Sequence, residues 1–401
     1  MRWPRTNAVY AGLAAALTVW ALVPIFTDTA QSLEVQPFPD SAEYADGAWQ
    51  LAHGHGYVTF VNEGASSPLF ASAVPSPPRY PFGTSVALAP FQLVIGHFPR
   101  GVQVGSRAIS AAYVIALVWA AWLLGGPLAG AVGALLVGLS PFAHVSATLI
   151  LSDALGALLT VAVLIALIRG SRRSIAIAGA LVGAILTVRT IGIILLPALF
   201  VAIGRDKQRI ALALLCGSPF VLALAIYQWH TFGSPLRTGY GYWVPGLKLV
   251  DPTYITGLRP GDGPFIIPDK LNGDLLSSVC PCGAGGPMSQ MSNVPFYASV
   301  LAGAFWIFAP PLTSLIGLAR VVRRRTTPAA RFVLVAVGLN FALLAVYYSQ
   351  GARLLAPAAS LLLVYSAAAI ADAADRVRRW ARSRVSSPLS AAALTDVARG
   401  R

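Results

Sequence analysis

Long apolar runs, separated by short polar or arginine-rich stretches, recur along nearly the whole chain. A helix that crosses a hydrocarbon core of about 30 Å needs roughly 20 such residues, so the pattern predicts an all-α polytopic membrane protein. No clean small-residue cleavage site follows the first run, and we interpret it as a span rather than a signal peptide. The candidate spans are residues 9–26, 84–98, 106–124, 127–141, 147–168, 174–188, 191–203, 209–229, 294–318, 329–348 and 352–374.

Two longer polar segments interrupt these runs. Residues 27–83 contain an amphipathic piece and a Pro-rich stretch, which predict short helices on the membrane surface followed by a turn. Residues 230–293 are rich in Gly, Pro and aromatic residues and have no helical period, so we expect an irregular lid there. Both segments are predicted to be extracytoplasmic loops.

The two loops share a face only if an even number of spans separates them, and the candidate list offers an odd number. Residues 127–141 form a short, Gly-rich run. Treating this run as re-entrant or interfacial resolves the conflict and leaves about ten spans. The alternative is one long helix over 174–203, which would move Asp153 to the cytoplasmic side.

Composition and charge agree with a membrane protein. Apolar residues make up 56% of the 401 residues and charged residues 11%, and the mean hydropathy is +0.68, which excludes a water-soluble globular chain. The net charge of +14 comes from arginine clusters in short loops and in the tail, as the positive-inside rule describes, so we expect no nucleic-acid partner. Residues 1–375 are predicted to form one membrane domain and residues 376–401 a basic cytoplasmic tail. Both termini are then cytoplasmic.

Two acids follow the first span. A carboxylate at this position can act as a general base, and Asp40 is our candidate for that role, with Glu43 in support. The same residues also fit a helix N-cap and a capping box, because Asp-x-x-Glu is a common start of a helix. Asp153 lies at the edge of an apolar run, where an ionised carboxylate needs a partner or an aqueous cavity. An N-cap is the alternative interpretation for Asp153.

Four arginines break the positive-inside rule on the outer face: Arg79, Arg189, Arg237 and Arg353. A lipid phosphate in a low-dielectric setting needs guanidinium groups or helix N-termini, so these residues are candidate phosphate ligands. Each could instead pair with lipid headgroups or snorkel to the interface.

The histidine and cysteine patterns predict no metal site. His53 and His55 supply two ligands at most. Cys280 and Cys282 fall in the second outer loop, where a strained disulfide is possible. We expect no dedicated metal residues, and the sequence leaves the use of a divalent cation open.

Several motifs occur in an order that resembles the GT-C superfamily of membrane glycosyltransferases, close to its protein O-mannosyltransferase and aminoarabinose transferase branch. They are Pro39-Asp40 to Tyr44, Ala52 to Tyr57, Arg79-Tyr80-Pro81-Phe82-Gly83, Leu151-Ser152-Asp153, Val188-Arg189-Thr190, Phe232 to Tyr240 and Gly351 to Pro357. The resemblance covers most of the chain. One difference is that relatives often carry two adjacent acids, where this chain has Asp40-Ser41 and then Glu43.

The resemblance implies a GT-C-like bundle and transfer of a sugar from a polyprenyl-phosphate donor on the non-cytoplasmic face. It implies that Asp40 is the catalytic base, that Asp153 faces the active cavity, and that Tyr80 lies with the arginines at the substrate site. The acceptor would be a lipid, a polysaccharide or a protein. Arginine and alanine usage is typical of a GC-rich bacterial genome, so the plasma membrane of a bacterium is the expected location. The competing hypothesis is a transporter or lipid flippase, but no internal repeat supports it.

Overall fold

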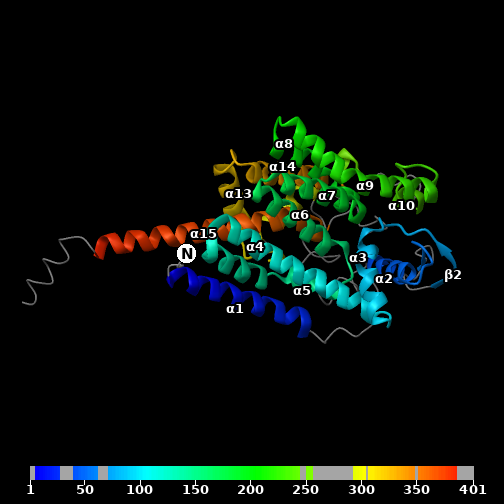
Figure 1. Cartoon of the computed structure of the whole chain (residues 1–401), viewed down its shortest axis with the longest axis horizontal. Helices are drawn as coiled ribbons and strands as arrows, with labels where there is room; N and C mark the ends of the chain where they lie inside the picture. The colour runs from blue at the N-terminus through cyan, green and yellow to red at the C-terminus, as the bar shows by residue number, and fades with distance from the viewer. Residues whose placement is uncertain are drawn as a thin grey trace, which may run out of the picture.

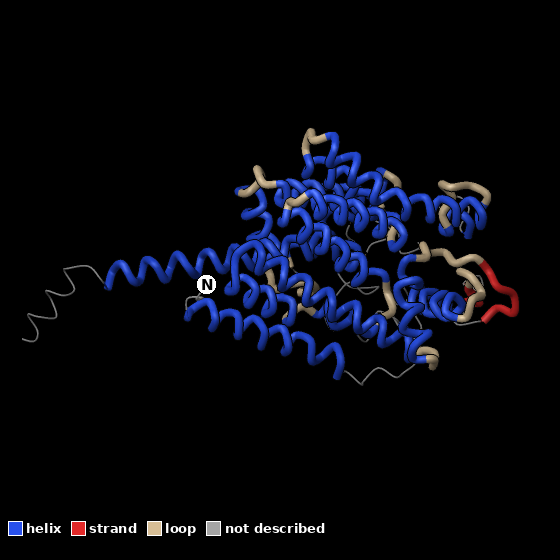
Figure 2. Tube along the Cα trace, viewed as in Figure 1, coloured by secondary structure: helices blue, strands red, loops and turns tan. Residues whose placement is uncertain are grey.

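The computed structural model describes residues 5–27, 39–61, 71–243, 250–255, 292–303, 306–347 and 351–385. Most of this part of the chain is helical, and Figure 2 shows most of the helices running side by side along the long axis of the molecule. Within the described ranges, six helices are long and apolar enough to cross a membrane, and two shorter apolar helices accompany them. The predicted all-α polytopic fold is confirmed.

The first layer consists of α1 (Arg5–Thr27) and α4 (Arg100–Gly138), which lie beside each other (Figure 1). α4 is two helices joined at a kink, because Gly126 has φ 79° and ψ −172° and Pro127 follows it. After the kink the chain folds back, so that a Cβ on Gly130 would lie 2.9 Å from Trp122 and one on Gly133 3.0 Å from Ala121. Small residues therefore allow the two legs to meet closely.

The end of the bundle at the right of Figure 1 carries most of the segment that we predicted to be the first outer loop, together with the helix that follows it. It contains α2 (Pro39–Ala52), the antiparallel strands β1 (Thr59–Val61) and β2 (Ala71–Ser76), and α3 (Gly83–Ile95). The carboxylate of Asp46 on α2 holds β1 by accepting hydrogen bonds from the Phe60 amide at 2.5 Å and the Thr59 hydroxyl at 2.9 Å. The expected short helix is present as α2 and a small hairpin follows it, whereas its position on the membrane surface stays a prediction.

The middle of the chain forms consecutive antiparallel helices. They are α5 (Pro141–Thr148), α6 (Ser152–Arg169), α7 (Arg172–Val188), η1 (Thr190–Ile194), α8 (Leu195–Ile203) and α9 (Lys207–Phe232). Glycines bring α7 and α9 into backbone contact: a Cβ on Gly179 would lie 2.2 Å from the carbonyl oxygen of Ala213. α10 (Gly239–Trp243) and η2 (Pro252–Ile255) follow α9.

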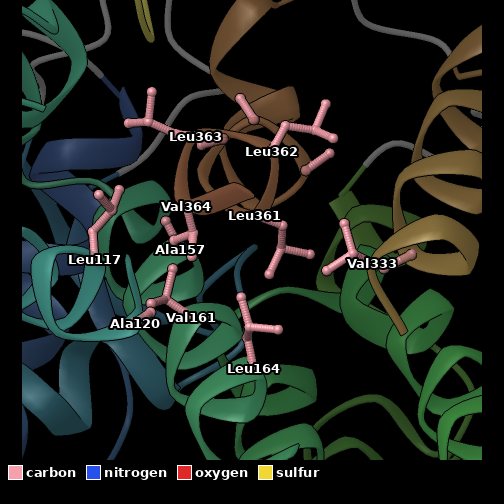
Figure 3. Packing of buried hydrophobic residues seen from close by; sticks show 14 of the residues in the cluster. Leu117, Ala120, Ala157, Val161, Leu164, Val333, Leu361, Leu362, Leu363 and Val364 are labelled. Carbon is pink, nitrogen blue, oxygen red and sulfur yellow. The ribbon is translucent and has the colours of Figure 1, made fainter. Parts of the chain in front are cut away.

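The last helices are α12 (Asn293–Ala302), α13 (Thr313–Arg323), α14 (Pro328–Ala345), η3 (Ala352–Leu355) and α15 (Ala356–Val385). α15 packs against α4, α6 and α13 in the centre of the bundle. Figure 3 shows its buried residues Leu361 to Val364 meeting side chains of α4, α6 and α14. Aliphatic side chains therefore pack along this helix in the core of the bundle.

The two ends of the bundle differ in charge. At one end Arg320 of α13 pairs with Asp372, Arg378 stacks on Tyr10 at 4.8 Å, and the rest of α15 projects outward (Figure 1). α14 has 18 residues and therefore spans about 27 Å from this end to the opposite one. The α2 end lies roughly one hydrocarbon thickness away from the arginine-rich end.

Our interpretation of three candidate segments needs correction. Residues 84–98 do not cross, because α3 has only 13 residues and stays at the α2 end of the bundle (Figure 1). Residues 127–141, which we expected to be re-entrant, instead form the return leg of the kinked α4. Residues 294–318 are split into α12 and α13, because Gly303 takes a positive φ and Pro310-Pro311 follows. Residues 127–141 thus take the place of residues 84–98 as a crossing segment. The number of crossings between the two predicted outer loops therefore stays even.

One further alternative is wrong, and several other predictions are not tested. The single long helix over 174–203 is wrong, because α7 ends at Val188 and Arg189 is extended. Residues 256–291, with Cys280 and Cys282, lie outside the described residues, so the predicted lid and disulfide are not tested. The boundary between membrane domain and tail stays a prediction: α15 continues without a break past residue 376, and residues 386–401 are outside the described part.

Candidate functional site

A cavity of about 100 Å³ lies at the α2 end of the bundle, where α6 and η3 begin and α7 ends. Four predicted charged residues line it, and they come from segments far apart in the sequence: Asp40, Asp153, Arg189 and Arg353. Tyr80, also predicted, lies beside them. The structure therefore brings together five of the eight predicted site residues.

Asp40 is in the first turn of α2, directly after Pro39. Proline is favoured at a helix start and an acid in the first turn interacts well with the helix dipole, so local sequence fixes this position. Its side chain is 18% exposed, and it accepts a hydrogen bond from the Tyr80 hydroxyl and one from Arg353 at 2.7 Å. The Asp40 carboxylate thus faces the cavity with two oriented donors.

Asp153 is in the first turn of α6, and its side chain is only 2% exposed. It pairs directly with Arg189, and an Arg353 nitrogen lies 3.4 Å from its other oxygen. Arg189 follows the last residue of α7 in an extended conformation, and Gly156 of α6 leaves room for its side chain, since a Cβ there would lie 3.3 Å from Arg189 Cδ. A buried carboxylate is therefore compensated by two guanidiniums.

The four charges form an alternating chain in which Arg353 links the two aspartates and Arg189 closes the far end. Burial raises the pKa of the Asp40 carboxyl, but the charge of Arg353 and the hydrogen bonds from Tyr80 and Arg353 outweigh burial and hold that pKa below its ordinary value. Asp40 is consequently ionised at neutral pH and can accept a proton. The formal charges of the four residues sum to zero.

Glu43 lies on the same face of α2 as Asp40 but does not line the cavity. It is 3% exposed and accepts hydrogen bonds from the backbone N–H groups of Arg79 and of Tyr80, the latter at 3.1 Å. Burial raises the pKa of the Glu43 carboxyl to about 7, against the opposing effect of the Arg79 charge. Glu43 therefore bonds to backbone amides outside the cavity, whereas a residue that touches a reacting group would line the cavity.

Two predicted arginines lie outside this cavity. Arg79 lines a smaller neighbouring cavity, between the Tyr80 segment and α9. The Arg237 guanidinium stands over the ring of Tyr242 at 5.4 Å, which is a cation–π contact at the start of the predicted second outer loop. Neither residue lines the cavity that contains Asp40, although the charge of Arg79 also acts on the Asp40 carboxylate.

Sequence reasoning missed several cavity residues. Tyr44 and Tyr240 supply aromatic walls, with the Tyr80 ring 4.9 Å from Tyr44 and 5.5 Å from Tyr240. Tyr44 could have been found from its spacing, because residue i+4 shares a helix face with Asp40. Nothing in the chain near Tyr347, another wall residue, signals its position.

His53 and His55 lie away from the cavity and are exposed. The His53 ring stacks on Trp49 at 4.1 Å, and the Nδ1 atom of His55 is hydrogen-bonded to the side chain of Gln50 at 2.8 Å. Across the described ranges, no three His, Cys, Asp or Glu side chains gather into a possible metal site.

Comparison with known proteins gives a clear structural likeness but little sequence identity. No known family model and no curated protein matches the sequence. ArnT from Cupriavidus metallidurans bound to undecaprenyl phosphate matches with a TM-score of 0.61 and 13% identity, over 90% of this chain and 60% of ArnT. ArnT in the apo state matches with a TM-score of 0.59 and 14% identity, over 97% of this chain and 64% of ArnT.

An archaeal protein has the same arrangement. The oligosaccharyltransferase AglB from Archaeoglobus fulgidus, in complex with an inhibitory peptide and a dolichol-phosphate, matches with a TM-score of 0.57 and 12% identity, over 96% of this chain and 53% of AglB. The chain thus spans between about half and two thirds of the length of these proteins. Nearly the whole chain takes part in each match, and it shares the fold of ArnT and AglB.

Proposed function

We propose that this protein is a membrane glycosyltransferase that transfers a sugar from a polyprenyl-phosphate donor to an acceptor hydroxyl on the extracytoplasmic face. The main support is that Asp40, an ionised carboxylate, shares one cavity with Arg189 and Arg353 at the end of the bundle opposite the basic end. The fold supports the same reaction class, because ArnT and AglB were solved with polyprenyl-type phosphates. By the positive-inside rule, the cavity end is the outer end.

The reaction needs a base and a means of stabilising the leaving group. Asp40 accepts the proton of the acceptor hydroxyl while the acceptor oxygen bonds to the anomeric carbon. The bond from that carbon to the phosphate oxygen breaks, and the polyprenyl phosphate leaves with an additional negative charge. Arg353 and Arg189 are the cavity cations that can stabilise this charge, because guanidinium groups bind phosphate oxygens through paired N–H donors.

Aromatic walls complete the site. The rings of Tyr44, Tyr80 and Tyr240 border the cavity and offer flat apolar surfaces against which a sugar ring can lie. Arg79 and Arg237 lie beside or outside the cavity and could meet the donor phosphate or its lipid as it approaches. Glu43 lies outside the cavity and holds the backbone of Arg79 and Tyr80 by hydrogen bonds.

The proposal is tested by reconstituting the purified protein in liposomes with radiolabelled polyprenyl-phosphate sugars and a membrane extract as acceptor. Asp40→Asn removes the base and keeps the shape, so transfer should fall by about 10²- to 10⁴-fold. Asp206→Asn is the matched control, because Asp206 caps α9 with a 46% exposed side chain at the other end of the bundle. Equal transfer by wild type and Asp40→Asn would remove Asp40 from its role. Donor movement across the bilayer without sugar transfer would favour a flippase.

A further inference from the structure

We propose that Glu43 is a positioning residue that holds the segment Pro77 to Pro81 against α2, so that the Tyr80 hydroxyl stays bonded to Asp40. The effect on catalysis rests on the proposed glycosyltransferase function, whereas the contact itself does not. Glu43 touches neither the cavity nor the reacting groups, so it acts through Tyr80.

The composition of the held segment makes Glu43 its main anchor. Residues 77–81 read Pro-Pro-Arg-Tyr-Pro, so only Arg79 and Tyr80 carry a backbone N–H group. Both of these groups donate to the same atom, Oε1 of Glu43. One buried oxygen therefore satisfies all the amide donors of a five-residue stretch, and a buried amide without a partner is strongly unfavourable.

Tyr80 is fixed at four points. Its N–H donates to Glu43 at 3.1 Å, and its carbonyl oxygen accepts a hydrogen bond from the Tyr57 hydroxyl at 3.1 Å. Its ring lies against that of Tyr44, and its hydroxyl donates to Asp40. Because Asp40, Glu43 and Tyr44 follow one another at i, i+3 and i+4, one face of α2 holds both ends of the same tyrosine.

The electrostatic surroundings of Glu43 explain why Glu43→Gln is an informative variant. Arg79 and Asp40 are the charged groups that act on Glu43, and burial raises the pKa of the Glu43 carboxyl to about 7. Tyr57, Tyr80 and Tyr227 are the titratable tyrosines in its electrostatic surroundings. Protonated Glu43 still presents a carbonyl oxygen, so Glu43→Gln retains the acceptor for both N–H groups. Glu43→Ala removes it.

The contact is measured by hydrogen–deuterium exchange of the full-length protein in detergent. A peptide covering 77–81 reports on two backbone amides only within that stretch, because its other residues are prolines. These two amides should exchange at least about tenfold faster in Glu43→Ala than in wild type, and Glu43→Gln should keep them protected. Asp46→Ala is the matched control, because its carboxylate holds β1 to the same helix in the same way. Unchanged protection in Glu43→Ala would overturn the proposed contact.

The functional consequence is measured as kcat and KM for sugar transfer. Glu43→Ala should lower kcat by about tenfold or more with a smaller change in KM, and Glu43→Gln should recover most of the loss. Tyr80→Phe should lower kcat to a similar extent while the two amides stay protected. Asp46→Ala should leave kcat unchanged.

Each negative result has a separate meaning. If wild type transfers no sugar, the proposed function fails, and the exchange data still decide whether Glu43 holds residues 77–81. If Glu43→Ala loses amide protection but keeps wild-type kcat, the positioning role is refuted and the proposed function stands. Failure of Glu43→Gln to rescue kcat would refute the role assigned to the acceptor oxygen.

Discussion

Neutralising Asp153 should destabilise the protein more than neutralising its partner Arg189. Asp153 is 2% exposed and interacts with both Arg189 and Arg353. The change Asp153→Asn leaves Arg189, 11% exposed, without the one carboxylate that pairs with it among the described residues. The change Arg189→Gln leaves Asp153 with Arg353, 3.4 Å away. The two variants therefore differ in how much uncompensated charge they leave in the cavity wall.

The magnitude follows from this asymmetry. Removing one partner of a buried ion pair costs about 3–5 kcal/mol, and polar contacts in membranes tend toward smaller values, so we expect about 3 kcal/mol for Asp153→Asn. Arg189→Gln should cost about 1.5 kcal/mol, because the remaining carboxylate keeps a cation. The double variant replaces both charges by amides and should also lose only about 1.5 kcal/mol, which corresponds to a coupling energy of about 3 kcal/mol.

The free energy of unfolding can be measured by titrating the detergent-solubilised protein with sodium dodecyl sulfate while following tryptophan fluorescence. Sugar transfer is measured on the same preparations, and the double variant should stay inactive although its stability recovers. Equal losses for the two single variants, or additive losses in the double variant, would show that Asp153 and Arg189 are not coupled as the structure indicates.

Two further predictions concern pH and packing. The pKa of Glu43 is raised from its ordinary 4.5 to about 7, so the folded state binds the proton more tightly than the unfolded state does. The free energy of unfolding should therefore fall by about 3 kcal/mol as the pH rises from 4.5 to 7. Urea or detergent unfolding of wild type and Glu43→Gln between pH 4.5 and 8 checks this, since a pH-independent difference between them would contradict it. Gly179→Ala should lower the unfolding free energy by about 1–3 kcal/mol, because its Cβ would lie 2.2 Å from the Ala213 carbonyl oxygen. Gly12→Ala has nothing within 4 Å and is the control; similar melting temperatures for the two variants would refute the close packing.

The sequence was informative about charges that stand in unusual places. Charged residues in places that usually lack them predicted one pocket: Asp153 in an apolar run, and Arg189 and Arg353 on the predicted outer face. The structure brings these three residues together with Asp40. Such residues are costly in a membrane unless they meet one another, so their positions constrain the fold. Arg79 and Arg237 break the positive-inside rule in the same way, yet they lie beside or outside the cavity. An arginine that violates the positive-inside rule is therefore expected on the same face as the cavity, but the violation does not show that the arginine lines the cavity.

Hydropathy could not separate crossing helices from embedded ones. Residues 84–98 and 127–141 are both short and apolar, and the sequence favoured the wrong member of the pair as the non-crossing segment. The deciding features are a kink at Gly126-Pro127 and the contact of Gln92 with Gly101, which keeps α3 beside the start of α4. Both depend on tertiary packing, which a single-sequence pattern does not contain. The role of Glu43 was hidden for a similar reason, because its partners are backbone amides distant in the sequence.

The balance of charges in the cavity connects donor binding to the strength of the base. Asp40, Asp153, Arg189 and Arg353 carry no net charge together, so a phosphate that binds one of these two guanidiniums competes with a carboxylate for it. Arg353 is 31% exposed and shared between two aspartates, whereas Arg189 is 11% exposed and bound to one, so Arg353 is the easier to draw away. Under the proposed function, a donor phosphate that engages Arg353 removes the main charge that lowers the pKa of Asp40. Asp40 then becomes a stronger base only once the donor is in place, which would couple proton abstraction to the presence of the sugar.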